Sequence, residues 1–302
     1  MRVLITGAAG FAGGHLAAHL VEAGHDVVGA GRAPEAPIAF DYVTLELRDA
    51  DAVRSAFAQV APDWVAHLAA DASVSESWED PRGTLHNNLD STLNVLDAAG
   101  AATVLVAGSG EVYGPPARLP VDETHELRPQ NPYAVSKAAA DVLAGFFADA
   151  HGRRVIRTRA FNHFGPGQSD LYVVAAFARQ IAEAERVGNG RVVVRTGNLE
   201  ARRDFTDVRD VVSAYALLME RAEPGAYNIC SGSSRSAGDI LAALARESPL
   251  EVAQETDPAR LRTNEVMEIR GSHQKLSEAT GWQPVVPFEQ TIRDTLDWWR
   301  SR

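Results

Sequence analysis

The 302-residue sequence contains a single cysteine, Cys230. One thiol cannot build an internal disulfide framework, and it cannot supply a cysteine-rich metal site. Cys230 directly follows the apolar stretch 227–229, which is typical of a buried strand. We therefore expect an inert thiol inside the protein core.

Long hydrophobic runs are also missing, because no apolar stretch approaches the 18 residues that a membrane helix needs. No charged and then apolar leader precedes the first strand-like run, so we expect a cytoplasmic protein. The formal net charge of −11 argues against non-specific binding to nucleic acid or to an anionic membrane. An anionic ligand must therefore be met by local clusters of arginine.

A glycine-rich turn stands between the first strand-like run, 2–6, and the helical stretch 15–23. Its glycines let the backbone approach a pyrophosphate closely, and the N-terminus of the following helix offers N–H groups to the phosphates. An ordinary glycine turn is the competing interpretation, but the flanking segments favour a nucleotide site. The pattern predicts a dinucleotide contact at Gly7, Gly10, Phe11 and Gly13.

The end of the second strand-like run indicates which dinucleotide is bound. A carboxylate at this place usually binds a free ribose 2′-hydroxyl, whereas an arginine suits a 2′-phosphate. The sequence has Arg32 there, and no carboxylate occurs before Glu35. We therefore expect NADP(H) as the cofactor, with NAD(H) as the alternative if Arg32 is only a solvated loop charge.

Strand-like and helix-like segments alternate along the chain, without an internal repeat. Apolar runs occur at 43–47, 64–68, 103–107, 154–159 and 226–229, and helical spacing occurs at 50–59, 84–99, 133–150, 177–186, 237–248 and 291–300. This alternation predicts an α/β fold, a Rossmann-type doubly wound parallel sheet with a smaller mixed α/β substrate domain. We expect residues 1–160 to form the NADP-binding domain, to which 203–232 return, and residues 161–202 and 233–302 to form the substrate domain.

Tyr133 and Lys137 are four residues apart, which places them on one face of a helix that Asn131 can cap. An ammonium beside a phenol favours the phenolate, so this tyrosine could exchange a proton with a sugar alcohol or ketone near neutral pH. Ser109 follows the run 103–107, and ligands of a parallel sheet lie beyond the carboxyl ends of its strands. Each residue alone is more often an ordinary surface or turn residue, so the combination carries the interpretation.

Five motifs in this order resemble the extended short-chain dehydrogenase/reductase family over essentially the whole chain. They are TGAAGFAG at 6–13, HLAA at 67–70, the asparagine of NNL at 87–89, the serine before EVYG at 111–114, and YAVSK at 133–137. The resemblance implies that Ser109, Tyr133 and Lys137 form a catalytic triad and that Lys137 also holds the nicotinamide ribose. It further implies that the cofactor is contacted by Tyr133 as well as by Leu68, Ala69 and Ala70.

The second half of the chain resembles members that act on nucleotide sugars. RAFNHFGPGQ at 159–168 looks like their substrate loop, which includes Asn162, and GNLEARRDFTDVRD at 197–210 is similar to the branch that handles GDP-linked 6-deoxy sugars. RLRTNEV at 260–266 resembles the RPxEV segment of that branch, with Thr263 in place of proline. By this resemblance we expect Arg203 and Arg262 on a diphosphate and Glu265 on a ribose.

The two residues that follow Ser109 bear on the type of reaction. At these positions family dehydratases have first a polar or acidic residue and then a glutamate. Gly110 cannot act as an acid, whereas Glu111 remains a candidate base. The resemblance therefore implies NADPH-dependent reduction of the 4-keto group of GDP-4-keto-6-deoxy-D-mannose to GDP-D-rhamnose. The alternatives are a GDP-mannose 4,6-dehydratase, a nucleotide-sugar 4-epimerase, and a non-catalytic dinucleotide sensor, which would not need the triad.

No residue pattern requires a metal. His67 and His163 have no second ligand at a metal-like spacing, so we expect packed or hydrogen-bonded histidines. Members of the family usually form homodimers through two helices of the sheet domain. By that resemblance we expect a homodimer through the helical segments 84–99 and 133–150.

Overall fold

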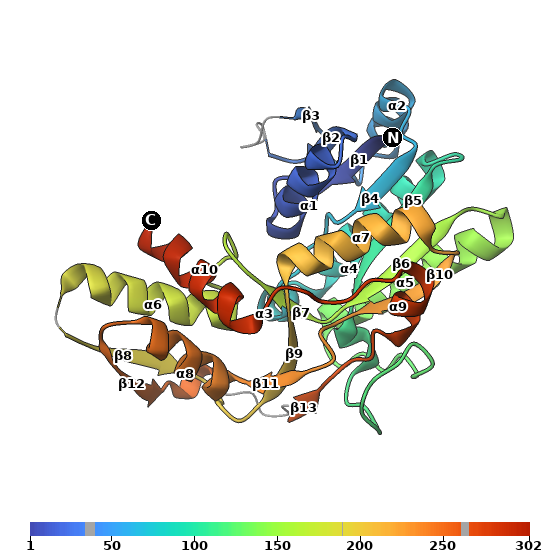
Figure 1. The fold of residues 1–302 in the computed structure, drawn as a ribbon. Helices are drawn as coiled ribbons and strands as arrows, with labels where there is room; N and C mark the ends of the chain where they lie inside the picture. Colours follow the sequence, from blue (N-terminus) through green and yellow to red (C-terminus); the bar gives the residue numbers. More distant parts are fainter. Residues whose placement is uncertain (34–39, 189, 261–265) are drawn as a thin grey trace.

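The computed structural model describes residues 1–33, 40–188, 190–260 and 266–302. Its larger part is a seven-stranded sheet with the strand order β10-β6-β5-β4-β1-β2-β3 (Figure 1), and every pairing in it is parallel. The strands are β1 (Arg2–Thr6), β2 (Asp26–Gly31), β3 (Asp41–Thr44), β4 (Trp64–His67), β5 (Thr103–Ser109), β6 (Val155–Ala160) and β10 (Gly225–Ile229). The order reverses between β1 and β4, so the doubly wound Rossmann-type sheet expected from the sequence is confirmed.

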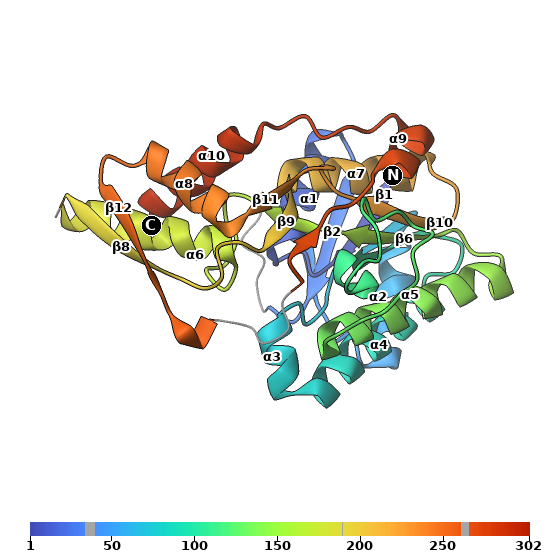
Figure 2. The same cartoon turned by 90° about the horizontal axis from the view of Figure 1, so that it is seen from below.

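Helices cover both faces of this sheet, which explains why most residues of its central strands are apolar. On one face, α1 (Phe11–Glu22) and α7 (Val208–Arg221) share a core that includes Leu16 and Leu218. On the other face lie α2 (Ala50–Val60), α4 (Pro81–Ala98) and α5 (Pro132–His151), whose shared core includes Leu96 and Phe147. Figure 2 shows α4 and α5 along one side of the sheet and α7 along the other.

The smaller part of the protein has its own core between α6 (Val173–Val187), α8 (Ala237–Glu247) and α10 (Phe288–Arg300). Two small sheets belong to this region. One pairs β8 (Arg191–Thr196) with β12 (Glu251–Thr256), and the other contains β7 (Asn162–Phe164), β9 (Arg202–Asp207), β11 (Ser234–Ser236) and β13 (Glu268–Ile269). Exposed and buried residues alternate strictly along β8, so one face of this strand packs inward while the other meets solvent.

The remaining elements are short: α3 (Val74–Glu79), α9 (Gln274–Thr280), and the 3₁₀ turns η1 (Gly110–Tyr113) and η2 (Pro258–Arg260). The topology of the large sheet determines where the residues of the candidate site lie. Because β1, β4 and β5 are adjacent and parallel, their carboxyl ends meet at one edge. The glycine turn, the segment 68–71 and η1 all begin there. Within the described ranges, no helix is long and apolar enough to cross a membrane.

Candidate active site

The turn between β1 and α1 is too tight for a side chain at two of its glycines. Gly7 has a φ of +73°, and a Cβ at this residue would lie 2.8 Å from the Ala69 nitrogen. A Cβ at Gly13 would lie 2.1 Å from the Gly7 carbonyl oxygen. Gly10 is the N-cap of α1 and offers no side chain to the N–H groups of the first helical turn. These N–H groups and the helix dipole can therefore meet an anion such as a pyrophosphate.

The segment after β4 is fixed beside this turn by a buried histidine. The His67 ring bonds the Thr6 hydroxyl through Nδ1 at 2.8 Å and the Thr92 hydroxyl through Nε2 at 3.1 Å. Burial lowers the pKa of His67 to about 3, so the ring is neutral at neutral pH. The Ala69 N–H also donates to the Thr6 hydroxyl at 3.3 Å. The prediction of a hydrogen-bonded histidine is confirmed, and residues 68–70 lie next to Gly7.

Arg32 directly follows β2, two strands away from β4 in the sheet. Its guanidinium lies 3.8 Å from the Asp71 carboxylate, and its side chain is 66% exposed. Asp71 is held in turn by Asn88, which accepts from the Asp71 N–H at 2.7 Å and donates to the Ser136 hydroxyl at 2.8 Å. An exposed cation therefore stands at the rim of the expected ribose site, where a 2′-phosphate can reach it.

Tyr133 and Lys137 lie on the first turns of α5, whose start agrees with the sequence. The Asn131 side chain caps the helix by accepting from the Ala134 N–H at 2.7 Å. Lys137 is buried, and its Nζ donates to the Ala107 carbonyl of β5 at 2.8 Å. Burial lowers the pKa of Lys137 to about 8. The lysine thus joins the helix to the carboxyl end of β5, which carries Ser109.

The expected easy deprotonation of Tyr133 is wrong, because its surroundings disfavour the phenolate. Burial raises the pKa of Tyr133 above its ordinary value, and a hydrogen bond with the Ser109 side chain opposes this rise only in part. The nearby carboxylate of Glu111 also disfavours the phenolate. The Lys137 ammonium donates a hydrogen bond to the Ala107 carbonyl. The phenol is therefore protonated at neutral pH.

The residues that follow Ser109 form the 3₁₀ turn η1. The Ser109 hydroxyl accepts from the Glu111 N–H at 3.2 Å, and the Glu111 carboxylate accepts from the Asn131 side chain at 3.3 Å. A Cβ at Gly110 would lie 3.1 Å from two ring carbons of Phe161. The buried Phe161 ring thus packs against the glycine and fills the space where a side chain would begin. Beside Ser109, Glu111 supplies the carboxylate and Gly110 supplies none.

The expected sugar-side residues lie on β7 and β9, which pair with each other. Asn162 is exposed at the start of β7, and the partly buried Arg203 donates to the Arg202 carbonyl at 2.9 Å. Next to Arg203, Asp204 is buried and accepts from the Ser231, Gly232 and Gly271 N–H groups. Arg262, Thr263 and Glu265 lie outside the described residues.

Comparison with known proteins places this arrangement in a family. A family model described as GDP-mannose 4,6 dehydratase matches residues 4–295. The chain belongs to this family. GDP-6-deoxy-D-mannose reductase of Pseudomonas aeruginosa is 40% identical over 310 residues, which cover 100% of this chain and 98% of the relative. UDP-glucose 4-epimerase of Mycolicibacterium smegmatis is 30% identical over 320 residues, which cover 100% of this chain and 99% of the relative.

A solved structure agrees with this assignment to the GDP-mannose 4,6-dehydratase family. RMD from Pseudomonas aeruginosa, complexed with NADPH, has a TM-score of 0.88 at 37% identity, and the match covers 99% of this chain and 97% of that one. The resemblance to extended short-chain dehydrogenases/reductases, drawn from five motifs, is therefore confirmed.

Phe11 of this dehydratase-family chain has a role that its motif does not show. Its ring stacks on the His163 ring, with centroids 6.0 Å apart and an interplanar angle of 7°. His15 bonds the Pro166 carbonyl at 2.9 Å, so the start of α1 holds the segment 163–166 at two points. Burial lowers the pKa of His163, which packs as expected. The side chain of Phe11 is thus used for packing, so the expected cofactor contact of Phe11 falls to its backbone N–H.

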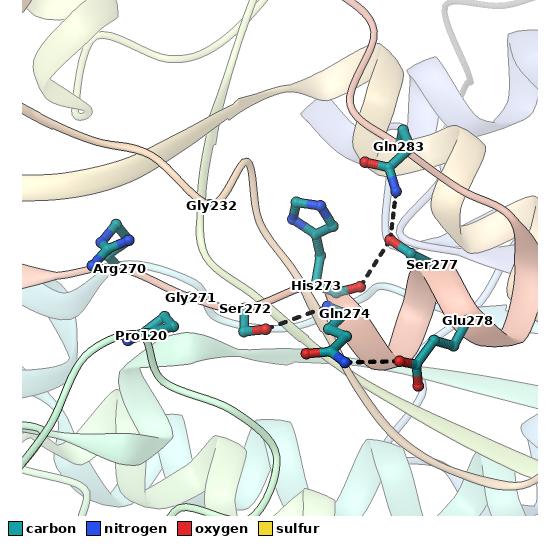
Figure 3. A pocket seen from close by; sticks show the side chains of 10 residues that line it. All are labelled: Pro120, Gly232, Arg270, Gly271, Ser272, His273, Gln274, Ser277, Glu278 and Gln283. Atoms are coloured by element: carbon teal, nitrogen blue, oxygen red, sulfur yellow. Dashed lines mark hydrogen bonds between the residues drawn. The ribbon is translucent and has the colours of Figure 1, made fainter.

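A cavity of about 400 Å³ lies elsewhere, beside α9 (Figure 3). Its wall has none of the expected catalytic residues; the lining residues are Pro120, Gly232, Arg270, Gly271, Ser272, His273, Gln274, Ser277, Glu278 and Gln283. Several of these side chains bond each other, as Gln274 does with Glu278 at 2.8 Å. Cys230, behind Gly271, is buried with a raised thiol pKa caused by burial, as expected of an inert core thiol.

A buried polar network behind the expected catalytic residues is not predicted by the sequence. Asp141, Arg159, Tyr113 and Asn228 are all nearly inaccessible, and each is hydrogen-bonded to the next. Asp141 follows Lys137 by four residues, so the spacing already places an acid on the same helix face. That spacing was the available signal, because the partners themselves are far apart in sequence.

Proposed function

We propose that the protein reduces the 4-keto group of GDP-4-keto-6-deoxy-D-mannose with NADPH, which gives GDP-D-rhamnose. The observation that carries this proposal is Gly110 packed against Phe161, since this position supplies no second acidic group beside Ser109 and a side chain there would be crowded by the Phe161 ring. Ketone reduction needs one proton donor and one hydroxyl to orient the carbonyl. The likeness to the Pseudomonas aeruginosa reductase over the full chain supports the same reaction.

The residues around the β1–α1 turn fit a dinucleotide. The uncapped N-terminus of α1 suits the pyrophosphate, and residues 68–70 form the adjoining wall. Arg32 suits a 2′-phosphate, so NADP(H) is the proposed cofactor and NAD(H) the alternative. When bound, the cofactor supplies the hydride. Lys137 holds the nicotinamide ribose, from a position already fixed by the Ala107 carbonyl.

The catalytic steps of this chain concern the oxygen on C4 of the sugar. Ser109 orients the carbonyl by donating a hydrogen bond to that oxygen, and Tyr133 delivers a proton to it as negative charge develops. The raised pKa of Tyr133 keeps the phenol protonated before the reaction. In this reduction Glu111 stays close to Tyr133 and keeps the phenolate unfavourable, so the phenol regains a proton after each turnover.

The sugar nucleotide is proposed to lie against β7 and β9. Asn162 bonds the sugar from its exposed position at the start of β7, and Arg203 binds the diphosphate from β9. Arg262 is proposed as the second diphosphate ligand, with Glu265 on the ribose. An arginine fork suits these phosphate oxygens because it donates two parallel charge-assisted hydrogen bonds.

One experiment separates the reductase from its alternatives. The protein is incubated with NADPH and GDP-4-keto-6-deoxy-D-mannose, and separately with NADP⁺ and GDP-mannose. We expect loss of NADPH absorbance with the keto sugar alone. A keto product from GDP-mannose would instead show a dehydratase, interconversion of C4 epimers would show an epimerase, and tight NADPH binding without any turnover would show a sensor.

The catalytic assignment has its own test. Tyr133→Phe should reduce the rate by about 100-fold or more, because proton transfer by a positioned side chain contributes about that much. Binding of NADPH should remain nearly unchanged, since the phenol is not used to hold the pyrophosphate. A fully active Tyr133→Phe protein would contradict the assignment.

A GDP-mannose 4,6-dehydratase is the second candidate, and Glu111 is the observation that favours it. This carboxylate lies in the turn after Ser109 and close enough to raise the pKa of Tyr133. A dehydratase needs such a base to remove the proton from C5 of the sugar. Glu111→Gln separates the two reactions, because it should abolish dehydration while leaving ketone reduction largely intact.

We also propose a homodimer through α4 and α5, which pack side by side in the helical layer on one face of the large sheet (Figure 2). Large apolar side chains on these helices are exposed to solvent, namely Leu93, Val135, Val142 and Phe146. Val142→Asp should convert the dimer to a monomer in light-scattering measurements. Val187→Asp on α6 is the matched control, because Val187 is similarly exposed but lies on another helix. A dimer that survives Val142→Asp would refute this interface.

The same proposal assigns cofactor binding and substrate binding to different parts of the chain. Residues 1–160 bind the cofactor together with 203–232, whose strand β10 joins the large sheet, while Arg203 at the start of this segment serves the sugar nucleotide from β9. Residues 161–202 and 233–302 bind the nucleotide sugar. We place the protein in the cytoplasm, and cell fractionation tests this location.

A further inference from the structure

A buried guanidinium lies between the two segments that carry the proposed catalytic residues. Arg159, on β6, is 6% exposed. Its Nε and Nη2 donate to the two carboxylate oxygens of Asp141 at 2.9 and 3.1 Å. Its Nη1 donates to the Tyr113 hydroxyl at 2.9 Å. One planar group thus holds a residue of α5 and a residue of η1 at the same time.

The first partner leads directly to the catalytic helix. Asp141 follows Tyr133 by eight residues and Lys137 by four, so all three lie on one face of α5. Its side chain is 2% exposed and binds Arg159 through both oxygens. A two-point contact between rigid planar groups fixes orientation as well as distance. The contact between Asp141 and Arg159 therefore fixes how α5 is rotated about its axis and shifted along it relative to β6.

The second partner leads to the turn that holds Ser109. Tyr113 is the last residue of η1, which begins directly after Ser109. Its hydroxyl accepts from Arg159 and donates to the Asn228 side chain at 2.7 Å, and its ring lies 5.2 Å from the guanidinium carbon. On the other side of the turn, Ser109 pairs with Ala160, the neighbour of Arg159. Both ends of η1 are thus held against β6, one by Arg159 and the other next to it.

We propose that Arg159 is a positioning residue that sets the geometry between Ser109 and Tyr133. It acts through Tyr113 on one side and Asp141 on the other, and it does not touch the substrate. This role rests on the proposed function, since it concerns the Ser109–Tyr133 pair as the reacting groups. A buried ion pair contributes little stability compared with apolar packing, but it specifies one arrangement of the groups around it.

Tyr113→Phe tests the link to η1 with minimal disturbance, because it removes one hydroxyl and keeps the ring. We expect kcat to fall by about 10- to 100-fold, as a misplacement of about 1 Å can cost that much. The KM for NADPH and the thermal midpoint should change little. Arg159→Lys should act in the same direction, since an ammonium cannot hold both partners with one fork. The matched control is Arg157→Lys, because Arg157 donates to Asp141 at 3.1 Å and, among the described residues, to no part of η1.

A double-mutant cycle distinguishes positioning from a general loss of structure. In the Ser109→Ala background the Ser109–Tyr133 geometry no longer matters, so Tyr113→Phe should lower kcat less than twofold further. A merely structural role would lower kcat by the same factor in both backgrounds, and that result would overturn the proposal. An unchanged kcat in Tyr113→Phe alone would overturn it as well.

A second readout does not depend on catalysis. The chain has six tyrosines, so fluorotyrosine labelling gives a resolvable ¹⁹F spectrum in which Tyr133→Phe identifies the Tyr133 resonance. Arg159→Lys should move that resonance toward its position in Ser109→Ala, whereas Arg157→Lys should not. If the keto sugar is not reduced but this shift occurs, the proposed function fails and the positioning role stands. If the keto sugar is reduced and the resonance stays in place, the positioning role fails.

Discussion

Lys137 should destabilise the protein at neutral pH, and this effect should disappear in alkaline solution. The residue is 9% exposed, and burial lowers its pKa from an ordinary value of 10.5 to about 8. In the unfolded chain the same lysine keeps its proton until about pH 10.4. Between these two values the unfolded state binds more protons than the folded state, so the free energy of unfolding rises with pH.

The size of the effect follows from the two pKa values. A fall of about 2.5 pH units corresponds to ~3 kcal/mol, since each unit is worth about 1.4 kcal/mol. The cost is complete below the folded pKa and is relieved as the pH rises through it toward the unfolded value. Lys137→Met lacks this titration. Its stability relative to wild type should therefore fall by ~3 kcal/mol between about pH 7 and pH 10.5.

Urea unfolding of the cofactor-free protein at a series of pH values measures this difference directly. Lys275→Met is the control, because the only other lysine is exposed although its Nζ also donates to a carbonyl at 2.8 Å. Desolvation lowers the pKa of Lys275 as well, but less than it lowers that of Lys137. Its difference from wild type should change much less over the same range. A Lys137→Met difference that stays constant from pH 7 to pH 10.5 would refute the reasoning.

Three further outcomes follow from the cofactor side of the site. Gly13→Ala should weaken NADPH binding at least 10-fold in calorimetric titration, because its Cβ would lie 2.1 Å from the Gly7 oxygen and the turn must open; unchanged affinity would contradict the tight turn. Arg32→Glu should reduce affinity for NADPH far more than for NADH, and an equal loss would remove Arg32 from the 2′-phosphate. His67 has a pKa lowered to about 3, so wild type should lose ~3 kcal/mol relative to His67→Gln as the pH falls from 7 to 4; parallel acid unfolding curves would contradict that shift.

The large sheet could be predicted from sequence because its strands are buried on both faces. Such strands are mostly apolar, and the run at 64–68 corresponds to β4, in which all four residues are buried. The helix α5 begins within one residue of the expected position, since Asn131 and Pro132 mark its start by side-chain chemistry. Local signals were sufficient in both cases.

Other elements escaped prediction for physical reasons. β11 and β13 contain three and two residues, which is too short for a period, and both exist because they pair with β9. The helix α7 does have an apolar stripe, but its start at Val208 lies inside the motif 197–210, whose resemblance drew attention to arginines instead. Its N-cap is Asp207, a residue also bound by Arg209 and Thr291, so the local cap signal is mixed with tertiary contacts.

The candidate site shows the same division between local and non-local information. Motif order predicts Ser109, Tyr133 and Lys137, and the structure places the Ser109 side chain close enough to the Tyr133 phenol to affect its pKa. Arg159 lies 18 residues from Asp141 and 46 from Tyr113. An arginine in a strand-like run gives no sign of such partners, because the sheet order alone brings them together.

The protonation of Tyr133 agrees with the proposed direction of the reaction. A dehydration or epimerisation cycle begins with oxidation at C4, for which the tyrosine must accept the proton of the sugar hydroxyl. Burial and the nearby Glu111 carboxylate hold the pKa of Tyr133 above its ordinary value, so the base form is scarce at neutral pH. A reduction begins instead with the phenol as donor, the form that these surroundings favour. The protein environment that makes Tyr133 a poor base therefore makes it ready for the first step of ketone reduction.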